Sequence, residues 1–288
     1  LPGGLPEHRI ICDGNQLNGS RWANIYINNN DTTDPDTQQN GGIVGSVSNN
    51  VIERSALSTN AGETARKHGG VIVESYQQLV VHGNIIRDVY EHIGGVDTRL
   101  TSGIQLSSLR NPNNDANITV SVQGNDIKRV KGNGLYIRNQ VGQVKVIGNT
   151  IDTCEREYIQ FDADAAGTNP YPTKLICNSN SFSGVNDDAN FEPMAERPYL
   201  IAFNSEFTEI ICNDNRIDMS NCVVPDGTYY MIRTRSSNFI SSGNHIRGPL
   251  DSGGVPKARA YQFDFVAGSG SRRIPECIVH GNNIGDCQ

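Results

Sequence analysis

The sequence predicts an all-β protein, a right-handed single-stranded parallel β-helix with long loops, and a repeated motif is the main reason. Alternating apolar residues, a turn residue and an asparagine recur nine times along the 288 residues. The clearest form is apolar-x-apolar-x-Gly-Asn-x-Ile, as in residues 120–127. Repeats with periods of about 20–50 residues are typical of solenoids and propellers. The central residues of the nine copies are Asn15, Asn50, Asn84, Asn125, Asn149, Asn180, Asn215, Asn244 and Asn282.

Each copy of the motif predicts two short strands joined by a corner. The positions three before and two after the asparagine are apolar in nearly every copy, as with Val146 and Ile151 around Asn149. Alternation at period two indicates strands with one buried face. The residue before the asparagine is Gly, Asn, Ser or Asp, and these types tolerate the positive φ of a sharp bend. We therefore expect stacked corners whose asparagine amides bond one another along a ladder.

Another short apolar segment before each later copy predicts a further strand. These segments are residues 71–73, 104–106, 135–137, 159–161, 201–203, 230–232 and 261–263. Their outer members are expected to face the core and their middle members to face outward. The intervals between successive asparagines run from 24 residues (125 to 149) to 41 residues (84 to 125), which indicates loops of unequal length. Propeller blades use tight antiparallel hairpins, which do not separate these segments, so a solenoid of about nine coils is favoured.

Composition agrees with a single β-helix domain over residues 1–288. Hydrophobic residues make up 36% of the chain, and there are 30 glycines and 12 prolines, as expected for a narrow core with many turns. The net charge of −7 without a basic cluster argues against nucleic acid as a partner, and no apolar run suits insertion into a membrane. Because no capping element flanks the repeats, we expect this chain to be part of a longer one that lacks its terminal caps here.

The cysteines predict free thiols rather than disulfides. Six of the seven fall on apolar positions of the repeat register, and Cys222 alone lies outside it. We therefore expect the six to serve as small core residues. Free thiols imply folding in a reducing cytoplasm. The six are Cys12, Cys154, Cys177, Cys212, Cys277 and Cys287.

Candidate substrate-binding residues lie on the outward face of the strand that precedes the motif. Stacking predicts that Arg138 lies beside Asp162 and that Arg233 lies beside Asp264. Amides, an aromatic ring and guanidinium–carboxylate pairs suit ligands rich in hydroxyl groups. The alternative is that this face carries only the polar residues and ion pairs of any exposed sheet. The candidates are Glu74, Gln105, Tyr136, Arg138, Gln160, Arg233 and Asp264.

Candidate catalytic residues are Asp162, Asp164 and Glu157. Asp162 and Asp164 leave one strand on the same side, and Glu157 could supply a second carboxylate for glycoside hydrolysis. Surface acids paired with arginines are the alternative interpretation. A polysaccharide lyase would instead need a base such as Tyr136. The histidines show no metal-ligand spacing, so neither a metal nor another cofactor is predicted.

With these motifs the chain resembles the parallel β-helix domains of bacteriophage tailspikes and pectate-lyase-like carbohydrate-active proteins. The corners at residues 81–86 and 279–284 carry the resemblance, which extends over nearly the whole chain. In its unequal coil lengths and unpaired cysteines, the chain is more similar to tailspikes than to the carbohydrate-active enzymes. Tailspikes fold in the host cytoplasm and belong to the virion tail. The resemblance implies a homotrimer that recognises a bacterial surface polysaccharide, capsule or O-antigen, and depolymerises it, with hydrolysis favoured over lysis.

The same residues are compatible with two other functions. The first is a non-catalytic β-helix that serves as a binding or structural module of a phage tail or cell-surface protein. The second is a secreted bacterial polysaccharide lyase, which would place the chain outside the cell and which the cysteine pattern disfavours. The motifs specify an architecture and not a reaction.

Overall fold

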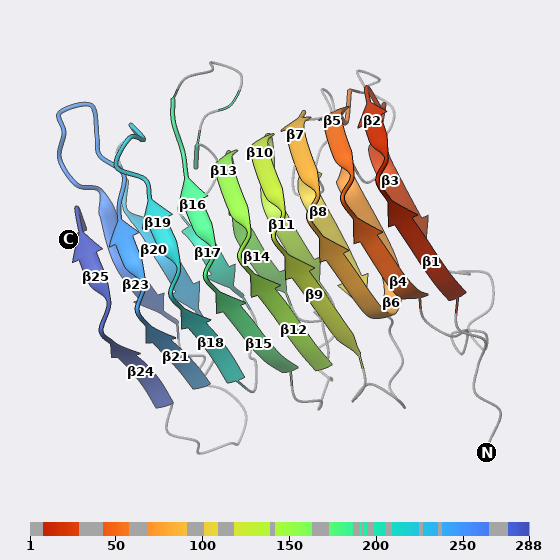
Figure 1. Ribbon diagram of the computed structural model, residues 1–288. Helices are drawn as coiled ribbons and strands as arrows, with labels where there is room; N and C mark the ends of the chain where they lie inside the picture. Colours follow the sequence, from red (N-terminus) through yellow and green to blue (C-terminus); the bar gives the residue numbers. More distant parts are fainter. Residues whose placement is uncertain are drawn as a thin grey trace.

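The structure is a computed structural model that describes residues 8–28, 43–57, 68–90, 101–108, 118–138, 142–162, 173–186, 191, 193–194, 199–204, 209–224, 227–235, 238–264 and 276–287. Every regular element in these ranges is a β-strand. The strands pair in parallel, in one sheet of 16 strands and one of 9. Figure 1 shows them stacked side by side from the N-terminal end (red) to the C-terminal end (blue). This all-β arrangement is consistent with a β-solenoid.

We divide the strands into three sheets. Sheet 1 contains β1 (His8–Asp13), β4 (Ile43–Ser48), residues 76–82 of β6 (His68–His82), β9 (Thr119–Gln123), β12 (Gly142–Ile147), β15 (Thr173–Asn178), β18 (Glu209–Asn213), β21 (Asn238–Ser242) and β24 (Glu276–His280). Sheet 2 contains β2 (Gln16–Asn18), β5 (Val51–Ser55), β7 (Ile85–Val89), β10 (Asp126–Val130), β13 (Thr150–Cys154), β16 (Ser181–Ser183), β19 (Arg216–Asp218), β22 (His245–Arg247) and β25 (Asn283–Gly285). Sheet 3 contains β3 (Ala23–Asn28), residues 68–74 of β6, β8 (Thr101–Ser108), β11 (Asn133–Arg138), β14 (Ile159–Asp162), β17 (Tyr199–Phe203), β20 (Tyr229–Thr234) and β23 (Ala258–Phe263).

In successive repeats the chain contributes a strand to sheet 1, then to sheet 2 and then to sheet 3. In sheet 1, β9 pairs with β12 and β12 with β15. In sheet 2, β10 pairs with β13 and β13 with β16, and in sheet 3, β11 pairs with β14 and β14 with β17. Sheets 1 and 3 count as one 16-stranded sheet because the long strand β6 belongs to both. The recurrent three-strand unit is the one that the sequence predicts.

The repeated asparagines form a continuous ladder at the corner between sheets 1 and 2, which confirms the prediction. Each side-chain amide donates to the side-chain oxygen of the next asparagine over 2.8–3.0 Å. Asn149 also donates to the carbonyl of Val122 and accepts from the backbone N–H of Asn125, both over 3.0 Å. Asn149 is 1% exposed. Because buried polar groups are costly unless they are hydrogen-bonded, this satisfied ladder holds the corners in register.

The corners have the backbone conformation that their residue types predict. The residue before each of the nine asparagines has a positive φ of 55° to 68°. A second bend, which the sequence did not indicate, follows four residues after the asparagine in β5, β7, β10 and β13. Its residues are Arg54, Asp88, Arg129 and Thr153, with φ of 54° to 58°. The same position also has a positive φ in the first and last repeats, at Gly19 (79°) and Asp286 (53°). Only Gly19 of these residues is a glycine, so composition carries little signal for this bend.

The core is a column of apolar side chains enclosed by the three sheets. Val146, Ile151 and Leu135 represent the three sheets in it, and each is fully buried. All seven cysteines are free thiols, as predicted. Cys222 also belongs to the core, although it lies outside the repeat register, and its thiol donates to the carbonyl of Gly184 over 2.9 Å. The described residues include no helix able to cross a membrane.

Candidate functional site

The outward face of sheet 3 carries two adjacent rows of side chains. The middle row is Tyr26, Ile72, Gln105, Tyr136, Gln160, Ala202, Arg233 and Gln262. The second row, two residues further along each strand, begins with Asn28, Glu74, Ser107, Arg138 and Asp162 in register. The residues between the two rows, such as Val73 and Ile137, point into the core. The strand alternation therefore gathers the predicted residues on one face.

One position of this register differs from the expectation. The sequence pattern predicts Met231 in the middle row and Arg233 in the second row, yet Arg233 lies in the middle row beside Ala202. The pairing of β17 with β20 passes over Leu200 and Met231, and both are completely buried. In β20 the consecutive inward residues Met231 and Ile232 break the alternation, so Arg233 takes the middle-row position that the pattern assigns to Met231.

Asp162 is the hub of the polar contacts on this face. Its carboxylate accepts hydrogen bonds from the hydroxyl of Tyr136 and from the side-chain amides of Gln160 and Asn204, each over 2.9 Å. The oxygen of the Gln160 side chain accepts from the amide of Asn133, also over 2.9 Å. A carboxylate offers about four lone-pair positions. Three donors therefore hold Asp162 in one orientation and leave about one lone-pair position of its carboxylate open.

The hydroxyl of Tyr136 is held in its protonated form. Burial raises the pKa of Tyr136 well above its ordinary value, and the charge of Asp162 and the hydrogen bond to it raise it further. A tyrosine in this setting donates a proton to a hydrogen bond and is a poor base at neutral pH. The hydroxyl that would act as the base in the lyase alternative already donates its proton to Asp162.

A second cluster surrounds Arg233. Its Nε donates to the carboxylate of Asp264 over 2.7 Å, and Gln262 donates to the other oxygen of that carboxylate over 2.8 Å. The guanidinium carbon lies 4.4 Å from the ring centroid of Tyr199. The ring of Tyr199 stacks on that of Tyr230 with centroids 5.8 Å apart. The predicted contact between Arg233 and Asp264 is present, and the aromatic pair adds a planar apolar surface beside it.

Asn204 joins the two clusters into one network. It donates to Asp162, and its side-chain oxygen lies 3.5 Å from Nη1 of Arg233. Asn204 is not among the predicted site residues, although it follows β17 directly, as Asp264 follows β23. Tyr199 was missed as well, because the sequence shows no period that would place it on this face. The polar network centred on Asn204 thus extends from β11 to β23.

The remaining predicted binding residues lie outside this network. Glu74 is 5% exposed and accepts a hydrogen bond from the hydroxyl of Tyr26 over 3.0 Å. Gln105 is completely buried, and within the described residues neither atom of its amide has a hydrogen-bond partner. Arg138 lies beside Asp162 in register, as predicted. Within the described part of the chain, however, Arg138 makes no ion pair, because neutral donors occupy the carboxylate of Asp162.

Of the three predicted catalytic carboxylates, Asp162 and Glu157 lie in the described part of the chain. Glu157 lies in the connection between β13 and β14 and is 4% exposed. Its Oε2 lies 3.8 Å from Nε of the equally buried Arg156. Asp164 lies outside the described residues. Asp162 is the predicted catalytic residue whose carboxylate takes part in the hydrogen bonds on the outward face. In the described ranges, no three His, Cys, Asp or Glu side chains are grouped to hold a metal ion.

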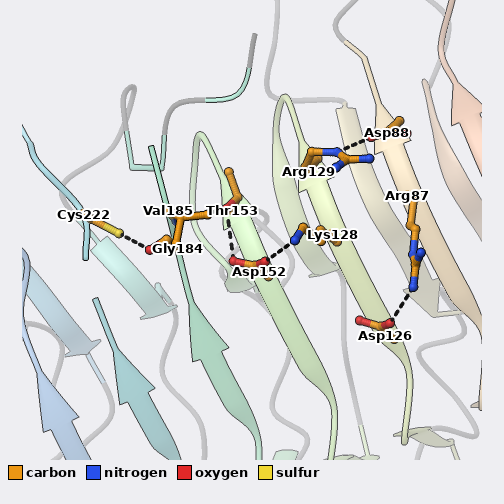
Figure 2. A network of polar contacts seen from close by, with 10 residues as sticks. All are labelled: Arg87, Asp88, Asp126, Lys128, Arg129, Asp152, Thr153, Gly184, Val185 and Cys222. Carbon is orange, nitrogen blue, oxygen red and sulfur yellow. Dashed lines mark hydrogen bonds and ion pairs between the residues drawn. The ribbon is translucent and has the colours of Figure 1, made fainter. Parts of the chain in front are cut away.

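Ion pairs alone do not distinguish sheet 3, because sheet 2 carries them too. Figure 2 shows Lys128 paired with Asp152 over 3.1 Å and Arg87 paired with Asp126 over 3.4 Å. The side chains of Arg87 and Asp126 are each 43% exposed, and such pairs contribute little to stability. What separates the face of sheet 3 is the combination of amides, a carboxylate hub and aromatic rings in one connected network.

Fold and site together define an all-β protein of stacked parallel strands, consistent with a β-solenoid, with a polar and partly aromatic outer face. Comparison of the chain with protein-family models, with curated proteins and with solved structures gave no match.

Proposed function

We propose that the protein recognises a bacterial surface polysaccharide, capsule or O-antigen, through the outward face of sheet 3, as a tailspike-type receptor-binding protein does. The observation that carries the proposal is the network in which Asn204 links Asp162 to Arg233 beside the ring of Tyr199. Sugars need paired donors and acceptors for their hydroxyls and an apolar surface for their ring faces. This network offers both along several neighbouring strands, which suits an extended polymer.

The network is also ordered before a ligand arrives. The side chains of Arg233 and Asp264 are 14% and 29% exposed and hold each other through their ion pair. Side chains that are already fixed lose less conformational entropy on binding. This supports recognition as the primary role of the face.

We further infer that the strands wind as a right-handed, single-stranded parallel β-helix of nine coils. Parallel strands of one sheet are joined by right-handed connections in about 98% of cases. One asparagine of the ladder stands in each of the nine repeats. With about 4.8 Å between neighbouring strands, a polysaccharide that follows the stacking direction would meet one new strand of sheet 3 per coil.

Glycoside hydrolysis is the second candidate function, and the partly exposed carboxylate of Asp162 on the sugar-binding face is the observation that favours it. A hydrolase needs two carboxyl groups at the scissile bond, and Asp164 is the nearest one in sequence. Release of reducing ends that disappears in Asp162→Asn and Asp164→Asn variants would support hydrolysis. Undiminished release by both variants would remove these residues from the mechanism, and no release by the wild type would leave a binding module. Products that absorb ultraviolet light because they are unsaturated would indicate a lyase.

We also propose assembly of three copies, folded in the host cytoplasm, in the tail of a virion. The outward face of sheet 1 supports contact between copies through a row of isoleucines: Ile176, Ile211, Ile240 and Ile278. Ile278 is 40% exposed, and contiguous apolar surface of this kind is typical of interaction sites. Light scattering should give three times the chain mass for the wild type and a smaller mass for Ile211→Lys. A monomeric wild type would contradict the assembly.

The recognition itself is tested on a panel of immobilised capsular polysaccharides and lipopolysaccharides. We expect the wild type to be retained by a narrow class of glycans and the double variant Tyr199→Ala, Arg233→Ala to lose that retention. Lys128→Ala on sheet 2 is the matched control, since it removes a cation from an ion pair on another face. If Lys128→Ala loses retention as the double variant does, or if the wild type binds no glycan, the proposal is wrong.

A further inference from the structure

A groove lies on the outer side of sheet 1, away from the residues of the network on sheet 3. Its volume is about 590 Å³, and its lining comes from β1, β4, β6, β9 and β12. This volume is within the range of roughly 300–1,000 Å³ that is usual for ligand sites. The strand register defines its floor as a single row across the strands: Ile11, Ser46, Val80, Ser121 and Lys145.

The charged residues of the groove are both cations. Arg9 and Lys145 line it, and no aspartate or glutamate is found among its described lining residues. Neither Arg9 nor Lys145 has an ion-pair partner in the described part of the chain. On the same face, by contrast, Lys174 is paired with Glu209 over 2.8 Å. In a chain with a net charge of −7, two uncompensated cations in one groove favour an anionic ligand.

The position of the two cations implies an elongated ligand. Arg9 lies on β1 and Lys145 on β12, which are separated by four steps between neighbouring strands. At about 4.8 Å per step, the two backbones are roughly 19 Å apart. A single small anion therefore contacts one of them, whereas a chain-like ligand with separated negative charges reaches both.

The neutral lining matches a saccharide better than a nucleic acid. Gln78 and Gln143 offer amide donors and acceptors, as hydroxyl groups of sugars require. Ile11 and Val80 are 71% and 44% exposed and give the floor an apolar surface for the C–H faces of sugar rings. Single-stranded nucleic acids are held by stacking on aromatic rings, and the described lining of the groove contains none.

We propose that this groove is a second glycan site, which binds an acidic oligosaccharide whose carboxylates contact Arg9 and Lys145. The ligand lies across the strands of sheet 1, with its ring faces on Ile11 and Val80. The proposal is independent of the recognition assigned to sheet 3, because the two faces share none of the residues named for either site.

The test uses calorimetric titration of the full chain with a hyaluronan hexasaccharide, in which carboxylates alternate with neutral rings. Maltohexaose is the neutral probe of equal length. We expect the hyaluronan probe to bind with an affinity that falls as salt is added, and Lys145→Gln and Arg9→Gln each to weaken it about tenfold. Lys174→Gln, the same change outside the groove on the same face, should leave the affinity unchanged, and so should Arg233→Ala on sheet 3.

Three outcomes would overturn the proposal. They are no binding of hyaluronan by the wild type, equal binding of maltohexaose, and equal losses in Lys145→Gln and Lys174→Gln. A loss in Arg233→Ala alone would assign the binding to sheet 3 instead. Unchanged denaturation midpoints and unchanged mass by light scattering in the variants show that folding and assembly are intact.

Discussion

Asn204 donates its side-chain amide to the carboxylate of Asp162 over 2.9 Å, across the boundary between neighbouring strands of sheet 3. The oxygen of the same side chain accepts a hydrogen bond from the guanidinium of Arg233. A neutral amide is suited to this position because its N–H donates to the carboxylate of Asp162 while its oxygen accepts from the guanidinium of Arg233. The two halves of the network therefore depend on one residue.

The first prediction concerns that residue. Asn204→Asp places a second carboxylate beside Asp162, and like charges this close repel one another. We expect a loss of about 1–2 kcal/mol in the free energy of unfolding at pH 7, which is recovered at pH 4 because one of the two carboxyls is then protonated. Urea denaturation at the two pH values measures the effect. Asn204→Ala is the control, since it removes the amide without adding charge and should show no such recovery.

The second prediction tests the asparagine ladder. Asn149→Ala leaves the amide of Asn125, the backbone N–H of Asn125 and the carbonyl of Val122 without their partner. Because these groups are buried, we expect a loss on the order of 3 kcal/mol. Asn15→Ala removes the exposed first step of the ladder and should cost less than about 1 kcal/mol. Equal denaturation midpoints for the two variants would mean that burial does not determine the strength of the ladder.

The third prediction concerns the corner conformation. Gly148 has a φ of +66° and no atom within 4 Å of the place that a Cβ would occupy. A substitution there is therefore limited by backbone strain and not by space. We expect Gly148→Asn to be tolerated, since Asn49 holds the same corner position with a φ of 55°. Gly148→Val should lower the free energy of unfolding by about 2 kcal/mol. Equal thermal midpoints for the two variants would contradict this explanation.

The fourth prediction is a loss of stability at alkaline pH. Burial raises the pKa of the Cys222 thiol to about 12, whereas an unfolded thiol has a pKa of about 8.5. The folded state therefore keeps its proton where the unfolded state loses it. The resulting stability is complete below about pH 8.5 and decreases as the pH rises toward the folded pKa, by on the order of 3 kcal/mol at pH 11.

Denaturation midpoints between pH 7 and pH 11 measure this loss. Cys222→Ala should be less stable at pH 7, because it leaves a cavity in the core, and should have a shallower decline. The decline should not vanish, since burial also raises the pKa of Cys154 and Tyr158. Parallel curves for the wild type and Cys222→Ala would show that this thiol does not titrate with unfolding.

The features that the sequence predicted well are those that recur in every copy of the motif. Asn149 and Gly148 occupy positions that are filled by the same kinds of residue in all nine repeats, so both the ladder and the bend follow from type and spacing. Free thiols followed in the same way, because the register placed Cys177 where other copies have valine.

The features that the sequence missed depend on single positions or on several strands at once. Leu200 and Met231 both face inward, and a local break in alternation cannot be read from a period of two. Glu157 was predicted as a second catalytic carboxylate, but it is 4% exposed and lies beside Arg156. The groove on sheet 1 is lined by side chains from five neighbouring strands. No single repeat contains all of these strands, so the groove cannot be read from one copy of the motif. Asn204 follows its strand as Asp264 does, but its spacing does not reveal the two partners that make it important.

The affinity of the chain for its best-retained polysaccharide, measured by calorimetric titration in the wild type, Arg233→Ala and Lys128→Ala, tests the central claim most directly. We expect Arg233→Ala to weaken binding at least tenfold, because it removes the cation that orders Asp264 and covers the ring of Tyr199. Lys128→Ala, on sheet 2, should bind as the wild type does. Wild-type affinity in a folded Arg233→Ala variant would contradict the assignment of polysaccharide recognition to the outward face of sheet 3.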